Sequence, residues 1–273
     1  MLPHDRREDE EEESMIANYH THTFRCGHAE GSDEDYVRQA VRSGLQILGF
    51  SDHTPYVYFD AEPRSRPIRM TPEELPDYAR SVRALAEQYR DRIEIRLGVE
   101  AEYYPKYFLR LLELLRENGV EYMILGQHFL GNEIGEAYSG RPTLDRKLLE
   151  RYVSQTIEAM ETGFFSYFAH PDLLRYIGSG KTYDQEMRRL CRAALQAEVP
   201  LEINLLGLRE RRHYPNERFW RIAAEEGNPV ILGCDAHGPE QLADTDSEKT
   251  ARALAERLGL TVLDTLPLRS IQR

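Results

Sequence analysis

The sequence lacks the features of a membrane or secreted protein. It contains no run of 18 or more apolar residues, so it predicts no transmembrane helix. The first residues are charged rather than apolar, unlike a signal peptide. The three cysteines, Cys26, Cys191 and Cys234, have no metal-finger spacing and do not make an even disulfide set. We therefore expect a cytoplasmic protein in a reducing compartment.

Positive charge is also scarce. Lys and Arg number 35 against 47 Asp and Glu, which gives a net charge of −12. Residues 1–14 hold seven acids and two bases, and we expect them to form a disordered acidic tail, with Met15 as an alternative start. Residues 15–273 are then one acidic domain. Because nucleic-acid binding depends on neutralising phosphates with Lys and Arg, this body argues against a nucleic-acid partner.

Short apolar segments alternate with helical patterns along the domain. The strand-like segments are bounded by turn residues and cover residues 15–19, 47–51, 93–99, 122–126, 166–169, 201–204 and 230–233. Amphipathic helices are expected within 32–44, 71–89, 106–117, 144–162, 184–196, 217–226 and 247–258. About seven βα units without a linker predict an α/β fold with a parallel sheet, either a closed barrel or an open doubly wound sheet.

Polar residues at the strand ends favour the barrel. A polar residue follows the C-terminal end of each of six strands; these residues are His53, Glu100, His128, His170, Asn204 and Asp235. In a barrel these ends meet at one face, where active sites normally lie. An open sheet would spread them along a line, too far apart for one site. We therefore predict a barrel of seven or eight strands.

Seven of the nine histidines join two carboxylates in an ordered series of metal-ligand residue types. The series is His20, His22, His28, His53, Glu100, His128, His170, Asp235 and His237. Neutral imidazole is the commonest metal-binding side chain, and imidazole mixed with carboxylate suits Zn, Mn or Fe. Nine ligands are too many for one tetrahedral ion. The series therefore predicts a multinuclear hydrolytic site.

Each motif in the series is weak alone. In His20-Thr21-His22 the period of two puts both imidazoles on one side of a strand, but two incidental histidines are an ordinary alternative. Glu100 can bridge two ions, and Glu102 competes for that role because it has the same facing; we prefer Glu100 because it is nearer the strand end. His4 and His213 are left out; we interpret His213 as a surface residue. A shared site explains the whole series better than separate coincidences.

The ordered ligand series resembles the polymerase-and-histidinol-phosphatase (PHP) superfamily. Its signature contains H-x-H, a further His, S-D-H, G-x-E, two isolated histidines and D-x-H, and here these motifs extend over nearly all of residues 15–259. The resemblance implies a distorted (β/α)7 TIM-like barrel with the metal site at the C-terminal ends of the strands. It also implies that residues 15–273 form a PHP metallophosphoesterase domain.

Within the superfamily, four segments are similar to the histidinol-phosphate phosphatases of PHP type. They are residues 20–28, 49–55, 204–209 with Tyr214-Pro215, and 233–237. The sequence departs from that pattern at Cys234 and Gln127, where Ser is usual, and at Leu205 and Leu206, which replace smaller polar residues. Because these leucines lie near the expected substrate, they put the identity of the substrate in doubt.

The resemblance divides the ligands among three divalent ions, which are Zn, Mn or Fe, alone or mixed. His20, His22, Glu100 and Asp235 would hold the first ion; Glu100, His128 and His170 the second; and His28, His53 and His237 the third. A water between two ions becomes a hydroxide nucleophile near neutral pH. Asp235 is expected to orient it and take its proton, and Glu100 is expected to bridge. The leaving alkoxide needs stabilising either by the third ion, which His53 helps to hold, or by a protonated group nearby that the sequence does not identify.

Two arginines and an asparagine are candidate substrate ligands. Arg209 follows the Gly207 turn at the barrel mouth and Arg175 follows His170, so both are placed to bind phosphate with the guanidinium fork. Asn204 is placed to hydrogen-bond a substrate amine or imidazole. The ordinary alternatives are solvated surface arginines and a helix cap.

The leading hypothesis is a metal-dependent phosphomonoesterase that hydrolyses L-histidinol phosphate in histidine biosynthesis. The alternative enzyme is a PHP phosphoesterase that acts on another small phosphomonoester or on a nucleotide. A non-catalytic metal-binding barrel is the third hypothesis, which the complete ligand series disfavours. No membrane or nucleic-acid partner is expected, and the sequence does not indicate an oligomeric state.

Overall fold

The computed structural model describes residues 14–57, 68–131 and 138–272. The predicted disordered tail, residues 1–14, lies outside the described residues except for Ser14. Among the described residues, no helix is long and apolar enough to cross a membrane.

The described residues form one sheet of eight parallel strands, which follow one another in chain order. The strands are β1 (Ala17–Asn18), β2 (Ile47–Phe50), β3 (Glu94–Ala101), β4 (Tyr122–Leu125), β5 (Phe165–Phe168), β6 (Leu201–Asn204), β7 (Val230–Gly233) and β8 (Val262–Leu263). The first seven match the predicted strands. The eighth, which the predicted count of seven or eight strands allowed, was not located in the sequence; its two residues are only half-buried.

Strand β7 shows how the sheet curls into a distorted barrel. At its start, Val230 and Ile231 pair with β8. Beyond its end, Ala236 instead pairs in parallel with Thr21, which follows β1. The His22 N–H donates to the Ala236 carbonyl at 2.9 Å, and the Ala236 N–H donates to the His20 carbonyl at 3.2 Å. We call this Thr21–Ala236 pairing the seam. It joins the two ends of a seven-stranded sheet at the C-terminal face and confirms the predicted fold.

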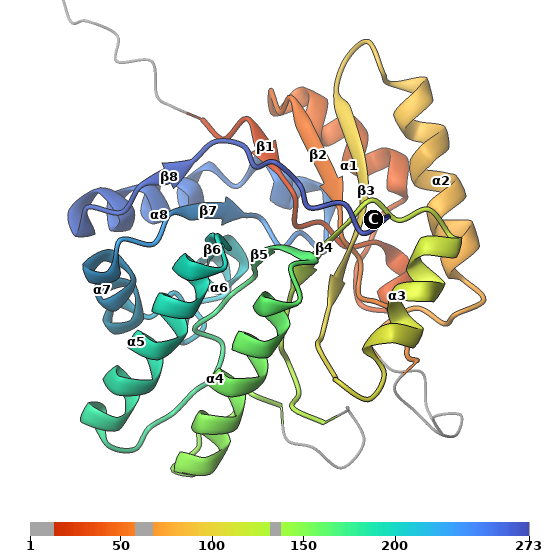
Figure 1. The fold of residues 1–273 in the computed structure, drawn as a ribbon. Coiled ribbons are helices and arrows are strands. Elements are labelled where there is room, and N and C mark those ends of the chain that lie inside the picture. Colours follow the sequence, from red (N-terminus) through yellow and green to blue (C-terminus); the bar gives the residue numbers. More distant parts are fainter. Residues whose placement is uncertain (1–13, 58–67, 132–137, 273) are drawn as a thin grey trace, which may run out of the picture.

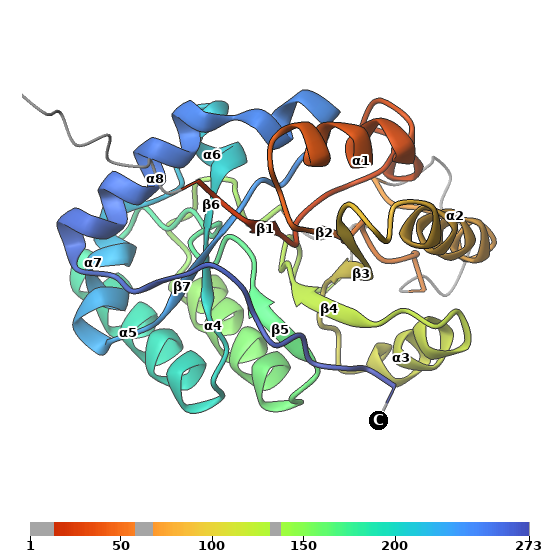
Figure 2. The same cartoon turned by 90° about the horizontal axis from the view of Figure 1, so that it is seen from above.

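Helices surround the sheet, as Figures 1 and 2 show. They are α1 (Asp33–Arg42), α2 (Leu75–Gln88), α3 (Phe108–Glu117), α4 (Arg146–Glu161), α5 (Gly180–Gln196), α6 (Leu205–Arg209), α7 (Glu217–Glu226) and α8 (Thr245–Leu258), with short 3-10 helices η1 (Phe24–Cys26) and η2 (Pro239–Ala243). Ser32 and Asp35 form the capping box that starts α1. Helix α6 was not predicted; it begins directly at the end of β6.

The interior of the barrel is filled from its N-terminal end. Tyr122 is fully buried, and its hydroxyl lies 3.0 Å from the Tyr19 carbonyl and 3.1 Å from that of Phe50. Gly49 and Gly98 leave room for its ring, since a Cβ on either would collide with it. The segment after β8 crosses this end of the sheet (Figure 2). The N-terminal end is therefore packed, and the C-terminal end is left for a site.

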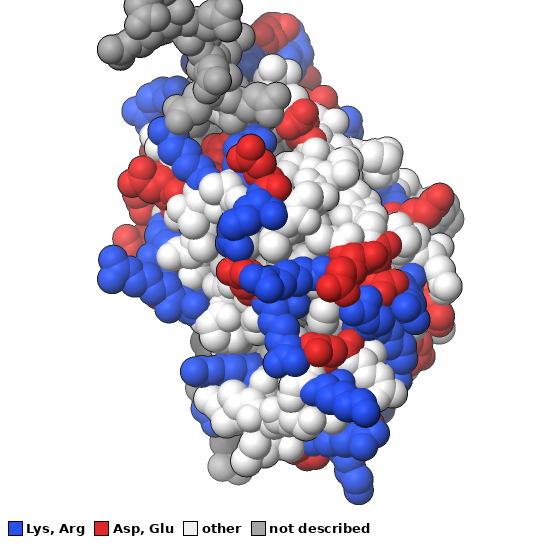
Figure 3. Space-filling model, turned by 90° about the vertical axis from the view of Figure 1, so that its left-hand side faces the viewer, with Lys and Arg blue, Asp and Glu red and all other residues white. Residues whose placement is uncertain are grey.

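The face formed by α5, α7 and α8 carries both signs of charge. Figure 3 shows Lys and Arg interspersed with Asp and Glu on this side of the molecule. Ion pairs link the helices: Arg192 of α5 contacts Glu226 of α7, and Arg257 of α8 contacts Glu217 of α7. Exposed pairs of this kind add little stability. On this face the charges do not form the basic stripe that nucleic-acid binding needs.

We predict that Gly98→Ala lowers the free energy of unfolding by about 1–3 kcal/mol, because the added methyl group overpacks the barrel against Tyr122. Urea denaturation measures the change. The loss should be smaller in a Tyr122→Leu background, where the ring is gone. An equal loss in both backgrounds would show that Tyr122 is not the reason for the glycine.

Candidate metal centre

The structure brings all nine predicted ligands to the C-terminal face of the barrel. Each leaves the end of a strand or the loop that follows it. Six of them, His20, His22, His53, Glu100, His170 and Asp235, are at most 5% exposed. His28, His128 and His237 are more open and line the same cavity. The predicted gathering of these nine residues at one face of the barrel is therefore present in the structure.

The seam explains why two pairs of ligands are each separated by a single residue. Thr21 and Ala236, the residues that pair across the seam, are the middle residues of His20-Thr21-His22 and Asp235-Ala236-His237. Because side chains alternate along extended backbone, each paired residue is flanked by two ligands that share a face. Four ligands are thus positioned by a single backbone pairing.

Glu100 lies at the centre of the cluster. Its Oε1 is 2.8 Å from His170 Nε2, 3.6 Å from His128 Nε2 and 3.7 Å from His20 Nε2. Its Oε2 is 3.0 Å from His53 Nδ1 and 3.6 Å from His22 Nε2. One carboxylate therefore faces five imidazoles, with different histidines at each oxygen. This is the arrangement that a carboxylate bridging two ions requires.

The competitor Glu102 is directed elsewhere. Its Oε2 accepts hydrogen bonds from Arg69 at 2.8 Å and from the Tyr104 hydroxyl at 2.6 Å. Its Oε1 accepts the backbone N–H groups of His128 and Phe129, both at 3.0 Å. Glu102 thus holds the loop that carries a ligand, and Glu100 occupies the central place that we preferred for it.

Asp235 completes a group with His20 and His22. Its Oδ1 is 3.1 Å from His22 Nε2 and 3.5 Å from His20 Nε2. Asp235 has φ of 46° and His170 has φ of 35°, both in the left-handed region. Such a conformation costs a residue with a side chain on the order of 1–3 kcal/mol and persists where the surroundings impose it. Two ligands are therefore held in strained backbone at strand ends.

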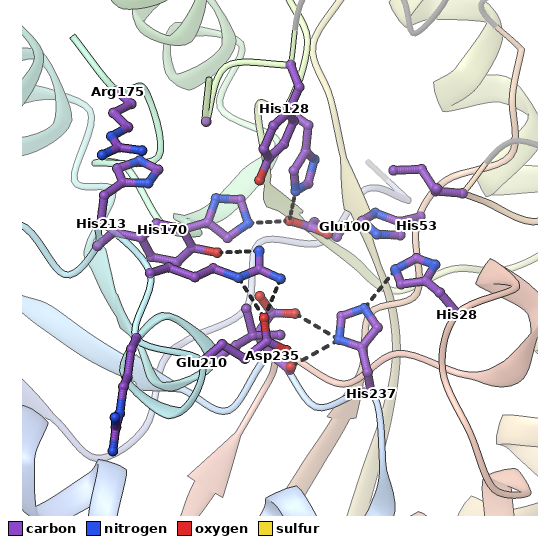
Figure 4. A pocket seen from close by; sticks show the side chains of 17 residues that line it. His28, His53, Glu100, His128, His170, Arg175, Glu210, His213, Asp235 and His237 are labelled. Carbon is purple, nitrogen blue, oxygen red and sulfur yellow. Dashed lines mark hydrogen bonds and ion pairs between the residues drawn. The ribbon is translucent and has the colours of Figure 1, made fainter. Parts of the chain in front are cut away.

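His28, His53 and His237 form a separate group whose nitrogen atoms lie within 4.8 Å of one another. His28 Nδ1 is 3.1 Å from the Cys26 carbonyl, and His237 Nδ1 is 3.2 Å from the Asp235 carbonyl. A carbonyl oxygen only accepts, so each Nδ1 carries the hydrogen and each Nε2 carries a lone pair. These two Nε2 atoms are 3.0 Å apart and point toward each other (Figure 4).

Protonation does not relieve this contact. Burial lowers the pKa of His28, and burial together with the charge of His22 lowers the pKa of His237 to about 3. Both imidazoles are then neutral near pH 7, and two lone pairs face each other. A cation between them resolves the conflict, so the donor set fits a metal ion.

The other two groups also contain unsatisfied donors and acceptors. Twelve buried side-chain atoms in the described residues make no hydrogen bond of suitable geometry, and six of them belong to the predicted ligands: His20 Nε2, both His22 ring nitrogens, His128 Nδ1, His170 Nδ1 and Glu100 Oε2. Two of the six, His22 Nε2 and Glu100 Oε2, have close ionic contacts instead, with Asp235 and His53. Unsatisfied buried polar atoms are costly and rare in folded proteins. Their concentration here indicates that the site is built for cations.

The carboxylates stay ionised despite their burial. Burial would raise the pKa of Glu100, but the charges of His128, His53 and His20 hold it well below the usual range. Burial would likewise raise the pKa of Asp235, and the neighbouring His20 and His22 hold it well below. Anionic oxygen atoms in a water-poor site attract divalent cations strongly.

Seven of the nine predicted ligands, all except His20 and His22, form one side of a cavity of about 900 Å³. Arg175, Arg211, Arg212 and Tyr214 also line it. Figure 4 shows His128 and His170 directed toward Glu100, with Arg175 and His213 on the opposite side of the view from His28. The cavity thus joins a cation site to guanidinium groups, a combination that suits a phosphate.

Two predicted substrate ligands have other contacts. Arg209 donates to Asp244 Oδ2 at 3.1 Å, to Gln241 Oε1 at 3.1 Å and to the Cys234 and Asp235 carbonyls at 3.3 and 3.4 Å. It is not among the described residues that line the cavity.

Asn204 is not among the described residues of the cavity lining either. Its Oδ1 accepts the Gly207 N–H and so caps α6, and its Nδ2 donates to Asp235 Oδ2 at 3.1 Å. These contacts favour positioning roles for both residues. Arg175, the third predicted substrate ligand, does line the cavity.

Several residues of this site were not predicted from the sequence. Arg211, Arg212 and Tyr214 line the cavity, because α6 turns Arg209 toward Asp244 and leaves the following arginines at the opening. His213, interpreted as a surface residue, is half-buried in the lining, and its Nε2 lies 2.7 Å from the Leu173 carbonyl. Glu202 was also missed; its carboxylate contacts His20 Nδ1. An acidic residue within an apolar strand is the feature of the sequence that could have pointed to it.

We predict that Glu100→Gln abolishes tight binding of at least two metal ions, because a neutral amide with one oxygen cannot bridge them. Metal analysis of the dialysed protein measures the stoichiometry. Glu186→Gln is the matched control, since Glu186 is a buried acid on α5 outside the ligand cluster. Retention of the full metal content by Glu100→Gln would contradict the bridging role.

The model of the PHP domain family matches residues 18–205. A probable histidinol-phosphatase of Deinococcus radiodurans is 30% identical over 236 residues, which cover 83% of this chain and 88% of the relative. One from Schizosaccharomyces pombe is 26% identical over 278 residues, covering 91% and 89%.

Among solved structures, the histidinol phosphate phosphatase of Lactococcus lactis in complex with Zn, L-histidinol and phosphate has the same fold. It superimposes with a TM-score of 0.72 at 19% identity, covering 95% of this chain and 98% of that one. The extent of the family match, together with the complete ligand cluster, leads to one conclusion: the chain belongs to the PHP domain family.

Proposed function

We propose that this protein is a metal-dependent phosphomonoesterase that hydrolyses L-histidinol phosphate to L-histidinol and phosphate. One observation carries the proposal: a ligand cluster with facing lone pairs opens into a cavity that is also lined by arginines. The relatives named histidinol-phosphatase, and the L. lactis structure with L-histidinol and phosphate, support this substrate. The cytoplasmic location and the role in histidine biosynthesis stay predictions.

Three divalent ions, Zn, Mn or Fe, fit the donor set. We assign His20, His22, Glu100 and Asp235 to the first, Glu100, His128 and His170 to the second, and His28, His53 and His237 to the third. Short distances within each group support this division. The groups adjoin one another, because His53 also lies with Glu100 and His128, and His170 also lies with His20 and Asp235. Zn in the L. lactis structure supports a divalent metal. When bound, such ions neutralise phosphate charge and lower the pKa of a water molecule.

Three ligands also have catalytic roles in this proposal. Glu100 connects the first and second groups. His53 connects Glu100 to the third group, because its ring belongs to that group while its Nδ1 is 3.0 Å from Glu100 Oε2. Asp235 lies at the edge of the cavity, where its carboxylate is placed to orient the attacking water and accept its proton.

The phosphate is held by Arg175 and Arg212 in this proposal. The backbone of Arg175 is anchored on both sides, because its N–H donates to the Ser139 carbonyl and its carbonyl accepts from the Thr143 N–H. Arg212 donates to the Tyr214 hydroxyl at 3.0 Å and to Glu210 at 2.8 Å, which orient its guanidinium at the cavity. The fork of an arginine matches two phosphate oxygens. Arg209 supports the loop behind them.

One observation favours an alternative substrate. Leu206, which departs from the family pattern, lines the cavity. An apolar side chain there suits a different small phosphomonoester or a nucleotide. The metal chemistry would be unchanged.

We expect the metal-loaded protein to release phosphate from L-histidinol phosphate with a kcat/KM orders of magnitude above that for other phosphomonoesters and nucleotides. A phosphate-release assay over such a panel measures this. Faster turnover of another member would keep the phosphatase chemistry and replace the substrate. Absence of turnover with metals bound would favour the non-catalytic barrel.

Substitutions of Arg212 and Arg209 distinguish a residue that contacts the substrate from one that positions the loop of the site. Arg212→Ala should raise KM at least tenfold, because a charge-assisted contact worth about 1.5–3 kcal/mol is lost. Arg209→Ala should mainly lower kcat, since it loosens the loop that carries Asp235. Steady-state kinetics with L-histidinol phosphate distinguish the two. A rise in KM for Arg209→Ala with unchanged kcat would restore Arg209 as a direct phosphate ligand.

Removal of metal with a chelator should abolish turnover and lower the melting temperature, because the facing donors lose the cations that hold them together. Calorimetry before and after chelation measures the shift. Zn²⁺, Mn²⁺ and Fe²⁺ should each be tested for recovery, which identifies the ions that support activity. Full activity of a metal-free preparation would refute the metal mechanism.

A further inference from the structure

Glu202 is a fully buried acid in the middle of β6. It has no ion pair with Lys or Arg among the contacts of the described residues, which makes it unlike the buried Glu102. A buried carboxylate is costly unless hydrogen bonds and opposite charge compensate it. Other contacts must therefore stabilise the Glu202 carboxylate in the barrel interior.

Its two oxygens together accept three hydrogen bonds. Glu202 Oε1 lies 2.7 Å from His20 Nδ1. Oε2 accepts the backbone N–H of His170 at 3.0 Å and the Nδ2 amide of Asn204 at 2.8 Å. The same Asn204 amide group donates to Asp235 Oδ2 at 3.1 Å. Through these contacts, Glu202 reaches three ligands that follow three different strands, β1, β5 and β7.

Each contact fixes a different property of a ligand. The contact with His20 holds the hydrogen on Nδ1 and leaves the Nε2 lone pair toward Glu100 and Asp235. The contact with the His170 N–H holds a residue whose φ is 35°. The Asn204 bridge fixes the second oxygen of Asp235, so that Oδ1 faces His20 and His22.

The neighbouring strand accommodates this carboxylate. Gly233, at the end of β7, lies against Glu202, and a Cβ at that position would collide with Oε1. A larger residue at position 233 would push the carboxylate away from His20. The interior of the barrel is thus shaped to hold this acid in one place.

We propose that Glu202 is a positioning residue for the first two metal ions. It acts on His20, His170 and, through Asn204, the side chain of Asp235. It makes no direct contact with the third group, whose His237 Nδ1 lies against the backbone carbonyl of Asp235. This inference rests on the proposed metal centre, and it adds a residue that coordinates no ion. Because all three donors direct N–H groups at Glu202, a carboxylate satisfies them all, whereas an amide offers one oxygen and one opposing N–H.

The test is Zn²⁺ binding to the purified full-length protein, titrated against a competing chelator. In Glu202→Gln we expect the two ions of the first and second groups to bind about 10–100-fold more weakly, the usual effect of removing the partner of a ligating histidine. The ion held by His28, His53 and His237 should keep its wild-type affinity. Glu186→Gln, which removes another buried acid, should change none of the three.

Glu202→Asp separates position from charge. It keeps the negative charge but shortens the side chain, so a positioning role predicts weaker binding of the same two ions. Wild-type affinity in Glu202→Asp would show that charge alone matters and would overturn the proposal. Urea unfolding of the metal-free variants provides the second measurement, because a purely structural role would lower stability and weaken all three ions together.

The outcomes distinguish this inference from the proposed function. If the wild-type protein binds no Zn²⁺ tightly, the metal centre itself fails. If the wild type binds three ions and Glu202→Gln binds them equally well, the metal centre stands and the role of Glu202 is refuted. Selective weakening of two ions, with wild-type affinity in the Glu186→Gln control, supports the role.

Discussion

The buried Glu100 carboxylate among five imidazoles is the interaction on which the rest of the site depends. Its oxygens lie between 2.8 and 3.7 Å from the nitrogen atoms of His20, His22, His53, His128 and His170. Such a set of acceptors and lone pairs is unstable without cations in a water-poor interior. The buried polar groups are confined to one end of the barrel, and the opposite end is packed with Tyr122 and its apolar neighbours.

Much of the architecture was predictable because strand ends carry their own chemical signal. Apolar segments bounded by turns indicated seven strands, and the polar residue after each one placed the ligands at a common face. The nine candidate ligands could be named because their residue types and order match a series that extends along nearly the whole domain. The predicted count of seven or eight strands allowed for β8 without locating it; its two residues are half-buried and, among the described strands, pair only with β7.

The supporting contacts were harder to predict. Whether Arg209 faces the cavity depends on α6, a five-residue helix that starts at Asn204 and turns the guanidinium toward Asp244. The roles of Glu102 and Glu202 depend on which side chains meet across strands distant in sequence. Local sequence patterns do not show which side chains meet across such strands. The sequence therefore predicted which residues bind metal, while the structure was needed to find which residues hold those side chains in place.

The seam between Thr21 and Ala236 makes assembly of the centre part of the folding of the chain. Its two edges come from opposite ends of the domain, so this closure carries an entropic cost that no local contact offsets. An ion shared by His20, His22 and Asp235 would act as a staple across that closure, much as a crosslink does. In a cell short of metal, the barrel would then open first at the face that carries the ligand cluster, which would couple metal supply to the lifetime of the folded protein.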